Sequence, residues 1–354
     1  MEYLVSFLAA AVVAGIPLLF ATVGEIITER AGNLNLGVEG MMLMGAVVGF
    51  LVGLTTKNAP LAILAAAMAG AFGAAIFAFL TITLRTNQVV TGLSLTIFGA
   101  GFSTMIGNEL IGEVAPSAIK EFFKPFTQTL SFGGLDAVPA PWELDGLAAL
   151  TPVGNLAHTG HIPVLGDIPV IGRIFFQQDM FVYIGYAVAI LAGIYLYRTR
   201  MGLNLRAVGE NPGAADASSI NVSLYKYVHI LIGGALCGLG GAYLSLVYVP
   251  AWQENVTAGR GWIAIALVIF SGWNPYKALS GAFLFGALSV LPLYFEELMR
   301  LIIGVPVQLT AFWRTVFDMM PYLVTIAVLF LSTLKFRKNA PPAGLGLPFF
   351  REER

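Results

Sequence analysis

Long apolar runs separated by short polar stretches make up most of the chain. An α-helix rises ~1.5 Å per residue, so a run of roughly 20 apolar residues crosses the ~30 Å hydrocarbon core of a membrane. The pattern predicts an all-α polytopic membrane protein with about nine transmembrane helices. These helices are expected near residues 3–23, 34–54, 60–84, 88–111, 179–197, 227–249, 261–273, 278–298 and 317–334. The run at 261–273 is short for a full crossing, which leaves a re-entrant or tilted segment open.

The composition indicates the same class of protein. Hydrophobic residues make up 57% of the 354 residues, charged residues make up 11%, and the mean hydropathy is +0.81. A soluble domain carries about 25% charged residues. The formal net charge is −1 and no basic tract is suited to nucleic acid, so we expect no nucleic-acid partner. The lone Cys237 lies in an apolar run and offers no disulfide framework.

Lys and Arg residues near the helix ends predict the orientation, because they favour the cytoplasmic side. With the C-terminus inside, twelve of the 19 basic residues face the cytoplasm and seven face outward. We therefore expect the N-terminus on the outer side and the C-terminus on the cytoplasmic side of the cell membrane. The predicted regions are the first helices at 1–111, an extracytoplasmic loop at 112–178, the later helices at 179–334 with a cytoplasmic loop at 198–226, and a cytoplasmic tail at 335–354. The outer loop is expected to form a small ordered cap and the tail a solvated anchor.

The cytoplasmic loop is the longest polar interruption between two apolar runs on that side. It contains a basic run that includes Arg206, a turn predicted at Gly209–Gly213 and a helix-prone piece at Ala214–Ser219. The spacing predicts a short helix that lies along the membrane face and is offered to a partner in the cytoplasm.

Polar residues at membrane depth are costly and usually face a pathway. Three groups of them interrupt the apolar runs: one in the Gly-rich stretch at 31–40, one at the start of the fourth predicted helix, and one before the 261–273 run. The candidate substrate-pathway residues in these groups are Asn35, Glu39, Gln88, Thr91, Ser94, Trp252 and Asn255. In helical form Asn35 and Glu39 would share a face. Glu39 has three open roles, as a proton-coupling carboxylate, a ligand contact or a buried structural acceptor.

Small residues repeat at helical spacing in several runs. Ala62, Ala66, Gly70, Ala74 and Ala78 form one ladder, and GxxxG patterns occur at 45–53 and 234–238. Such ladders let helix backbones approach closely, so we interpret them as packing surfaces. A weak echo between residues 31–45 and 258–272 suggests either an inverted repeat or a chance similarity.

No catalytic constellation is visible in the sequence. The chain lacks the GxxxxGK[ST] loop that cradles nucleotide phosphates, and its three His residues lack metal-ligating companions. We therefore predict a protein that is not an enzyme, with no catalytic residues, no metal site and no cofactor bound directly.

Four blocks of the sequence resemble ABC importer permeases of the simple-sugar and nucleoside group, within the branched-chain amino acid and ribose permease superfamily. They are GEIITERAGNLNLGVEGMMLMGA at 24–46, GDIPVIGRIFFQQDMFVYI at 166–184, RTRMGLNLRAVGENPGAADASSINV at 198–222 and GRGWIAIALVIFSGWNP at 259–275. The likeness is greatest to permeases for purine nucleosides such as guanosine. The outer loop is expanded relative to shorter members, which puts the docking of a delivering protein in doubt.

This resemblance implies a type II ABC importer permease fold and a set of partners. The expected partners are an ABC ATPase subunit that binds ATP and Mg²⁺, a second permease subunit in a homo- or heterodimer, an extracytoplasmic solute-binding lipoprotein, and membrane lipids. The segment at 209–220 would dock in the ATPase. The coupling residues implied in and beside it are Arg206, Gly209, Glu210, Asn211, Ala214, Ala215, Ser218 and Ile220. The alternatives kept open are a ribose-like sugar permease and a proton-coupled secondary transporter.

Overall fold

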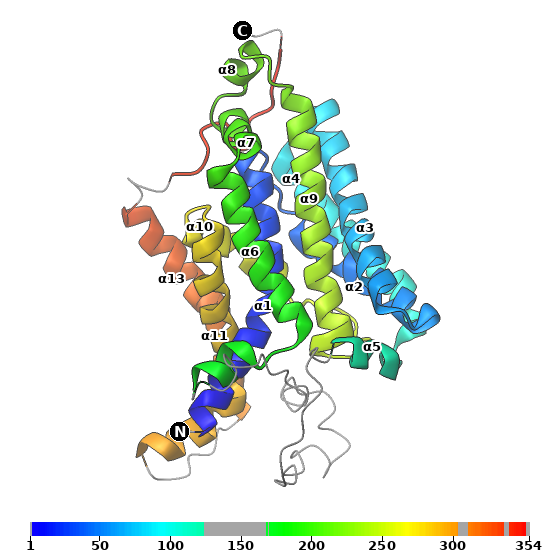
Figure 1. The fold of residues 1–354 in the computed structure, drawn as a ribbon, viewed down its shortest axis with the longest axis vertical. Helices are drawn as coiled ribbons and strands as arrows, with labels where there is room; N and C mark the ends of the chain where they lie inside the picture. Colours follow the sequence, from blue (N-terminus) through cyan, green and yellow to red (C-terminus); the bar gives the residue numbers. More distant parts are fainter. Residues whose placement is uncertain (1, 124–167, 169, 304–310, 336–339, 352–354) are drawn as a thin grey trace.

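The computed structural model describes residues 2–123, 168, 170–303, 311–335 and 340–351. Most of these residues are helical (Figure 1), and their strand-like pairing is limited to an isolated antiparallel bridge between Val114 and Ala251. This architecture confirms the predicted all-helical class.

The first part of the chain forms five α-helices. They are α1 (Glu2–Arg30), α2 (Val38–Thr56), α3 (Ala59–Ala78), which continues into the π-helix η1 (Phe79–Thr83), α4 (Gln88–Gly107) with the 3₁₀-helix η2 (Asn108–Leu110), and α5 (Ser117–Phe123). The second part begins with the π-helix η6 (Gly172–Phe176) and continues with α6 (Met180–Arg198), α7 (Arg200–Glu210), α8 (Pro212–Ala217), α9 (Val222–Tyr243) with the π-helix η7 (Leu244–Tyr248), α10 (Arg260–Ser271), α11 (Pro275–Ile303), α12 (Ala311–Asp318) and α13 (Met320–Lys335).

Each of the predicted apolar runs overlaps a helix, although the run at 34–54 starts before α2 and the run at 317–334 is divided between α12 and α13. Among the described residues, seven helices are long and apolar enough to cross a membrane, whereas α10 and the apolar stretch Thr315–Ala327 are shorter. The chain is therefore a multi-pass membrane protein. The 12 residues of α10 extend only ~18 Å, which is less than the hydrocarbon thickness. A crossing at this point therefore needs the irregular segment at 249–259 as well as the helix.

Polar residues at the ends of the apolar runs explain where many helices begin. Asn58, Asn87, Asp179, Thr199, Asn211 and Asn221 each accept a hydrogen bond from a backbone N–H in the first turn of the following helix. A capping side chain satisfies donors that the helix itself leaves free. The same residues therefore mark the ends of the polar connections and set the starts of the helices.

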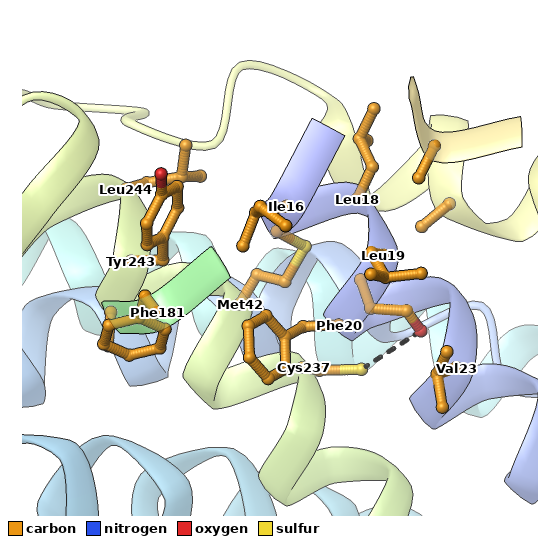
Figure 2. Packing of buried hydrophobic residues seen from close by; sticks show 14 of the residues in the cluster. Ile16, Leu18, Leu19, Phe20, Val23, Met42, Phe181, Cys237, Tyr243 and Leu244 are labelled. Atoms are coloured by element: carbon orange, nitrogen blue, oxygen red, sulfur yellow. Dashed lines mark hydrogen bonds between the residues drawn. The ribbon is translucent and has the colours of Figure 1, made fainter. Parts of the chain in front are cut away.

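Helix α1 lies in the centre of the core and packs against α6, α9, α10 and α11. Figure 2 shows its apolar side chains meeting Met42 of α2, Phe181 of α6 and Cys237 of α9. The Phe20 and Phe181 rings pack edge to face with centroids 5.7 Å apart. The Cys237 thiol is buried and free, and donates a weak hydrogen bond to the carbonyl of Ala21 at 4.0 Å.

Small residues bring α2 and α3 against α9. A Cβ added to Gly45 would lie 2.3 Å from the Cα of Gly238, and one added to Gly70 would lie 2.2 Å from the carbonyl oxygen of Gly234. Backbones this close have no room for a side chain. The predicted packing role of the small-residue ladders is confirmed at these crossings.

The two ends of the bundle differ. Helices α7 and α8 and the C-terminal segment lie at one end, and the N-terminus, α5 and η6 lie at the other (Figure 1). This arrangement agrees with termini on opposite sides, while the number of crossings and the direction of insertion stay predictions. The predicted outer cap falls mainly on residues 124–167, outside the described residues.

The C-terminal segment at 340–351, named here the C-terminal strap, is docked on the bundle, so the prediction of a solvated anchor is wrong for these residues. Gly344 N donates to Gly209 O at 2.9 Å, and Gly346 N donates to Gly32 O at 3.2 Å. Pro342 and Gly344 are buried. Its Pro and Gly residues let the strap turn at 343–346 where it meets α7 and the 31–37 loop, and tertiary hydrogen bonds replace the solvent that the composition suggested.

Candidate functional site

A buried junction joins the start of α2 to the start of α10. The Glu39 carboxylate is 5% exposed, and its Oε1 accepts hydrogen bonds from Thr257 Oγ1 at 2.5 Å and Gly259 N at 2.8 Å. Its Oε2 accepts from Gly261 N at 2.5 Å. A carboxylate placed at a helix N-terminus satisfies orphan N–H donors and interacts favourably with the helix dipole. Of the three roles left open for Glu39, these contacts are those of a buried structural acceptor.

The loop at 31–37 connects α1 to the start of α2, next to Glu39. Residue Asn35 lies in this loop because α2 begins at Val38, so the expectation that Asn35 and Glu39 share a helical face is wrong. Glu25 of α1 accepts hydrogen bonds from Asn35 N at 3.1 Å and Asn35 Nδ2 at 3.2 Å. Unwound backbone inside a membrane protein needs such partners, since lipid supplies none.

Gln88 and Thr91 also serve the backbone around them. Gln88 Oε1 accepts from Leu34 N at 2.7 Å, which ties the start of α4 to the 31–37 loop. Thr91 Oγ1 donates to Asn87 O at 2.8 Å. Ser94 Oγ donates to Val90 O at 2.9 Å. Ser94 is exposed whereas Gln88 and Thr91 are buried, so the three residues do not line one common surface.

Trp252 and Asn255 lie in the segment at 249–259 that precedes α10. Trp252 is 2% exposed and packs against Phe50, with ring centroids 5.8 Å apart. Its indole Nε1 has no hydrogen-bond partner among the described residues. Asn255 is exposed and has a left-handed backbone with φ 52°. The seven candidate residues are thus spread over the two irregular segments, the start of α2 and α4, and their assignment to a substrate pathway stays a prediction.

Sequence reasoning assigned no role to two carboxylates on α1, Glu25 and Glu29, which are 0% and 2% exposed. Glu29 accepts a hydrogen bond from Trp273 Nε1, and the Arg30 guanidinium donates to Trp273 O at 3.1 Å from its Nη2. The end of α1 therefore holds Trp273, two residues after the end of α10. The sequence signal that could have identified them is their spacing, since two acids four residues apart in an apolar run lie on the same side of a helix.

At the end of the bundle that is predicted to face the cytoplasm, α7 and α8 form two short helices with Asn211 between them. The predicted turn at Gly209–Gly213 is too long, since α7 runs to Glu210 and α8 starts at Pro212. Asn211 Oδ1 caps α8 by accepting from Ala214 N at 2.9 Å. One short side chain can cap the second helix directly, so the break needs a single residue.

The eight candidate coupling residues divide by exposure. Gly209 and Ala215 are buried, and Arg206 and Ile220 are partly buried; the exposed ones are Glu210, Asn211, Ala214 and Ser218. A Cβ added to Gly209 would lie 2.2 Å from Arg30 O, so this residue serves close backbone packing. The four exposed residues form the part of the segment that a cytoplasmic partner could reach.

Comparison with known proteins gives full-length matches. The family of branched-chain amino acid transport system permease components matches residues 7–329. A putative glucose ABC transporter permease of Haloferax volcanii is 35% identical over 99% of both chains. The guanosine ABC transporter permease of Bacillus subtilis is 30% identical over 98% of this chain and 96% of its own.

A nucleoside ABC transporter permease of Lactococcus lactis is 32% identical over 89% of this chain and 88% of its own. No solved structure gives a significant match.

Proposed function

This chain belongs to the family of branched-chain amino acid transport system permease components, and on that premise we propose that it is the membrane-spanning permease subunit of an ABC importer. Three relatives that match 88–99% of their own lengths are ABC transporter permeases. That full-length similarity is the observation that carries the proposal. The proton-coupled alternative loses its main support, because the Glu39 carboxylate is occupied by three donors at the α2–α10 junction.

ATP hydrolysis is assigned to a separate subunit that binds ATP and Mg²⁺. The sequence contains no phosphate-binding loop of the GxxxxGK[ST] type, so the chain does not supply that chemistry by this route. The segment formed by α7 and α8 is proposed to dock in the ATPase through Glu210, Asn211, Ala214 and Ser218, which are exposed. Closure of the ATPase would then push on α8 and switch access to the transport pathway.

Two further partners are proposed from the same class. A second permease subunit, identical or related, would complete the pathway, and an extracytoplasmic lipoprotein would deliver the solute at the end that carries α5 and η6. Purification of the complete transporter, followed by identification of its subunits, distinguishes a homodimer from a heterodimer.

A purine nucleoside is the proposed solute, with a sugar as the alternative. The guanosine and nucleoside permeases support the first reading, and the putative glucose permease, at 35% identity, supports the second. A nucleobase is flat and polar at its edges, so aromatic stacking and amide contacts would bind it. The candidates for these contacts are Trp252, Gln88, Asn255 and Asn35. The side chain of Asn35 also donates a hydrogen bond to Glu25.

The test is solute uptake into vesicles that contain the complete transporter. ATP and a proton gradient are supplied separately, and guanosine uptake is measured in competition with other purine nucleosides, glucose and ribose. ATP-dependent uptake that nucleosides block and sugars do not is the expected result. Competition by sugars alone would transfer the solute to the sugar class, and uptake driven by the proton gradient without ATP would overturn the importer class.

A further inference from the structure

A cavity of about 580 Å³ lies at the end of the bundle that carries α7 and α8. Its walls come from the starts of α4 and α9, the end of η1, α8 and the C-terminal strap. A volume of 300–1,000 Å³ is typical of sites for small molecules. Three basic side chains line it, Arg85, Lys226 and Arg351, against one acidic side chain, Asp216.

Lys226 is the central feature of this cavity. Its side chain lies on the first turns of α9, lines the cavity and is 4% exposed. Among the described residues it has no hydrogen-bond or ion-pair partner, whereas Arg351 Nε lies 3.3 Å from Asp216 Oδ2. Lys226 has lost much of its surrounding water, and no carboxylate of the described residues pairs with it. The cavity therefore holds a cation that a bound anion would neutralise.

Backbone and amide donors surround the same space. Asn33 is 1% exposed, and its Nδ2 has no hydrogen-bond partner among the described residues. The N-terminal residues Val222 and Ser223 of α9 also line the cavity. Asn221 caps the N–H of Leu224 and so leaves the donors before it free. A helix N-terminus favours negative charge because of its free N–H groups and its dipole.

Arg85 contributes from a strained position. It follows η1 in a left-handed backbone with φ 57°, and its guanidinium lies 4.6 Å from the centre of the Phe350 ring of the strap. Ser219, which lines the cavity opposite, has φ 65°. A left-handed backbone in a non-glycine residue persists only where surrounding structure holds it, and such positions gather at ligand sites.

We propose that this cavity binds a phosphate-bearing anion, with Lys226, Asn33 and the N-terminus of α9 as its donors and Arg85 at its mouth. The chemistry is that of a small phosphate monoester, such as a nucleoside monophosphate, or of a phospholipid headgroup that enters from the membrane face. Apolar side chains beside the donors, Ile82 and Phe349, provide a wall for the uncharged part of the ligand. The carboxylate of Asp216, the acidic side chain of the lining, lies 3.3 Å from Arg351 Nε and so already has a cationic neighbour.

A ligand in the cavity would connect helices α4, α8 and α9 to the C-terminal strap. The ligand would touch α4, α8, α9 and the strap at once, because all four line the space. Binding therefore stabilises the docked arrangement of α8 and the strap. The site requires no assumption about the transported solute, and equilibrium binding tests it separately from transport.

The experiment measures binding and thermal unfolding of the full chain in nanodiscs. In neutral phosphatidylcholine, guanosine 5′-monophosphate is the probe for a free phosphate monoester, and guanosine is the matched compound without phosphate. In a second arm the nanodiscs contain phosphatidylglycerol and no added nucleotide. The expected result is saturable binding of the monophosphate, or stabilisation by the anionic lipid, that weakens as salt rises.

Lys226→Gln is expected to weaken binding at least tenfold, since a charge-assisted hydrogen bond is lost. Lys226→Arg, which keeps the charge, is expected to stay within about threefold of the original chain. Lys277→Gln is the matched control, because Lys277 is exposed and does not line the cavity. If Lys226→Gln does not fold, Arg85→Gln tests the same cavity with a smaller expected loss.

Each outcome decides the proposal. Binding of the monophosphate in neutral lipid assigns the site to a soluble phosphate ester, and stabilisation confined to phosphatidylglycerol assigns it to a lipid headgroup. Equal binding of guanosine, unchanged affinity in the Lys226→Gln and Arg85→Gln variants, or no response in either arm would overturn the phosphate site.

Discussion

The α2–α10 junction and the cavity lined by Lys226 both contain polar groups in an apolar protein, but the polar groups differ in whether the chain supplies their partners. At the junction the Glu39 carboxylate meets three donors, so its hydrogen-bonding capacity is used within the chain. In the cavity Asn33 Nδ2 is buried without a partner, and no hydrogen bond or ion pair joins the largely buried Lys226 to another described residue. A satisfied buried charge holds elements together, whereas an unsatisfied one is a candidate for binding something else.

The largest expected effect is at the junction. Glu39→Ala leaves the buried Gly261 N–H and Thr257 hydroxyl, and the partly buried Gly259 N–H, without their acceptor. Each unsatisfied buried donor costs about 1–3 kcal/mol, so a loss of at least about 3 kcal/mol in the free energy of unfolding is expected. Thermal unfolding of the purified chain measures it.

Glu109→Ala is the control, because Glu109 is exposed. Wild-type stability in Glu39→Ala, combined with loss of proton-driven uptake, would show that Glu39 is a proton carrier and that its role at the junction is secondary.

A smaller loss of stability is expected where the strap meets α7. Gly209→Ala places a Cβ 2.2 Å from Arg30 O, while Gly209 O accepts the hydrogen bond from Gly344 N. Overpacking of this kind costs about 1–3 kcal/mol. Limited proteolysis should then cut the strap faster, whereas Gly213→Ala, whose nearest contact is 3.5 Å away, should leave the strap protected. Equal protection in both variants would contradict the docking of the strap on α7.

Substitutions in the coupling segment at 209–220 are expected to reduce transport without destabilising the fold. Glu210→Lys reverses an exposed charge at the end of α7, so about a tenfold loss of uptake per ATP hydrolysed is expected in the complete transporter, equivalent to about 1.4 kcal/mol. Glu210 Oε2 also accepts from Ala343 N, and Glu210→Gln keeps an acceptor for that bond. Glu109→Lys is the control for charge reversal. Unchanged coupling in Glu210→Lys would remove this residue from the ATPase contact.

An effect of similar size concerns the pH dependence of stability at the opposite end of the bundle. Burial raises the pKa of Asp179 from 3.8 to about 6, against hydrogen bonds from Val182 N and the Tyr243 hydroxyl that lower it. The folded state therefore favours the protonated form. Stability contributed by this group is present below about pH 4 and is lost as pH rises through about 6. The loss is on the order of 1–2 kcal/mol, since Asp179 is partly exposed.

Asp179→Asn should flatten the dependence between pH 4 and pH 7. The measurement is the difference in unfolding temperature between the two chains at each pH, which cancels the contribution of other carboxylates. A constant difference across this range would show that Asp179 does not titrate within it.

The sequence by itself determined the class of the protein and the position of its helices. Apolar runs long enough to span a membrane have no other stable arrangement in lipid than hydrogen-bonded helices, and capping residues such as Asn58, Asn87 and Asp179 mark where they start. The small-residue ladders likewise predicted close helix packing, because only residues without bulk permit it. The polar segment between two spans predicted one short helix at Ala214–Ser219, where the structure has α8 at Pro212–Ala217, whereas the helix α7 at Arg200–Glu210 was not predicted.

Only the tertiary structure decided what the polar residues do. Glu39 and Thr257 are 218 positions apart, and the strap reaches Gly32 and Gly209 from the far end of the chain. Local spacing placed Asn35 and Glu39 on one helix, but a carboxylate on α1 holds Asn35 in an unwound loop. Hydrogen-bond partners of this kind depend on which helices pack together, and the physical reason is that a buried polar group takes whichever partner the fold brings within about 3 Å.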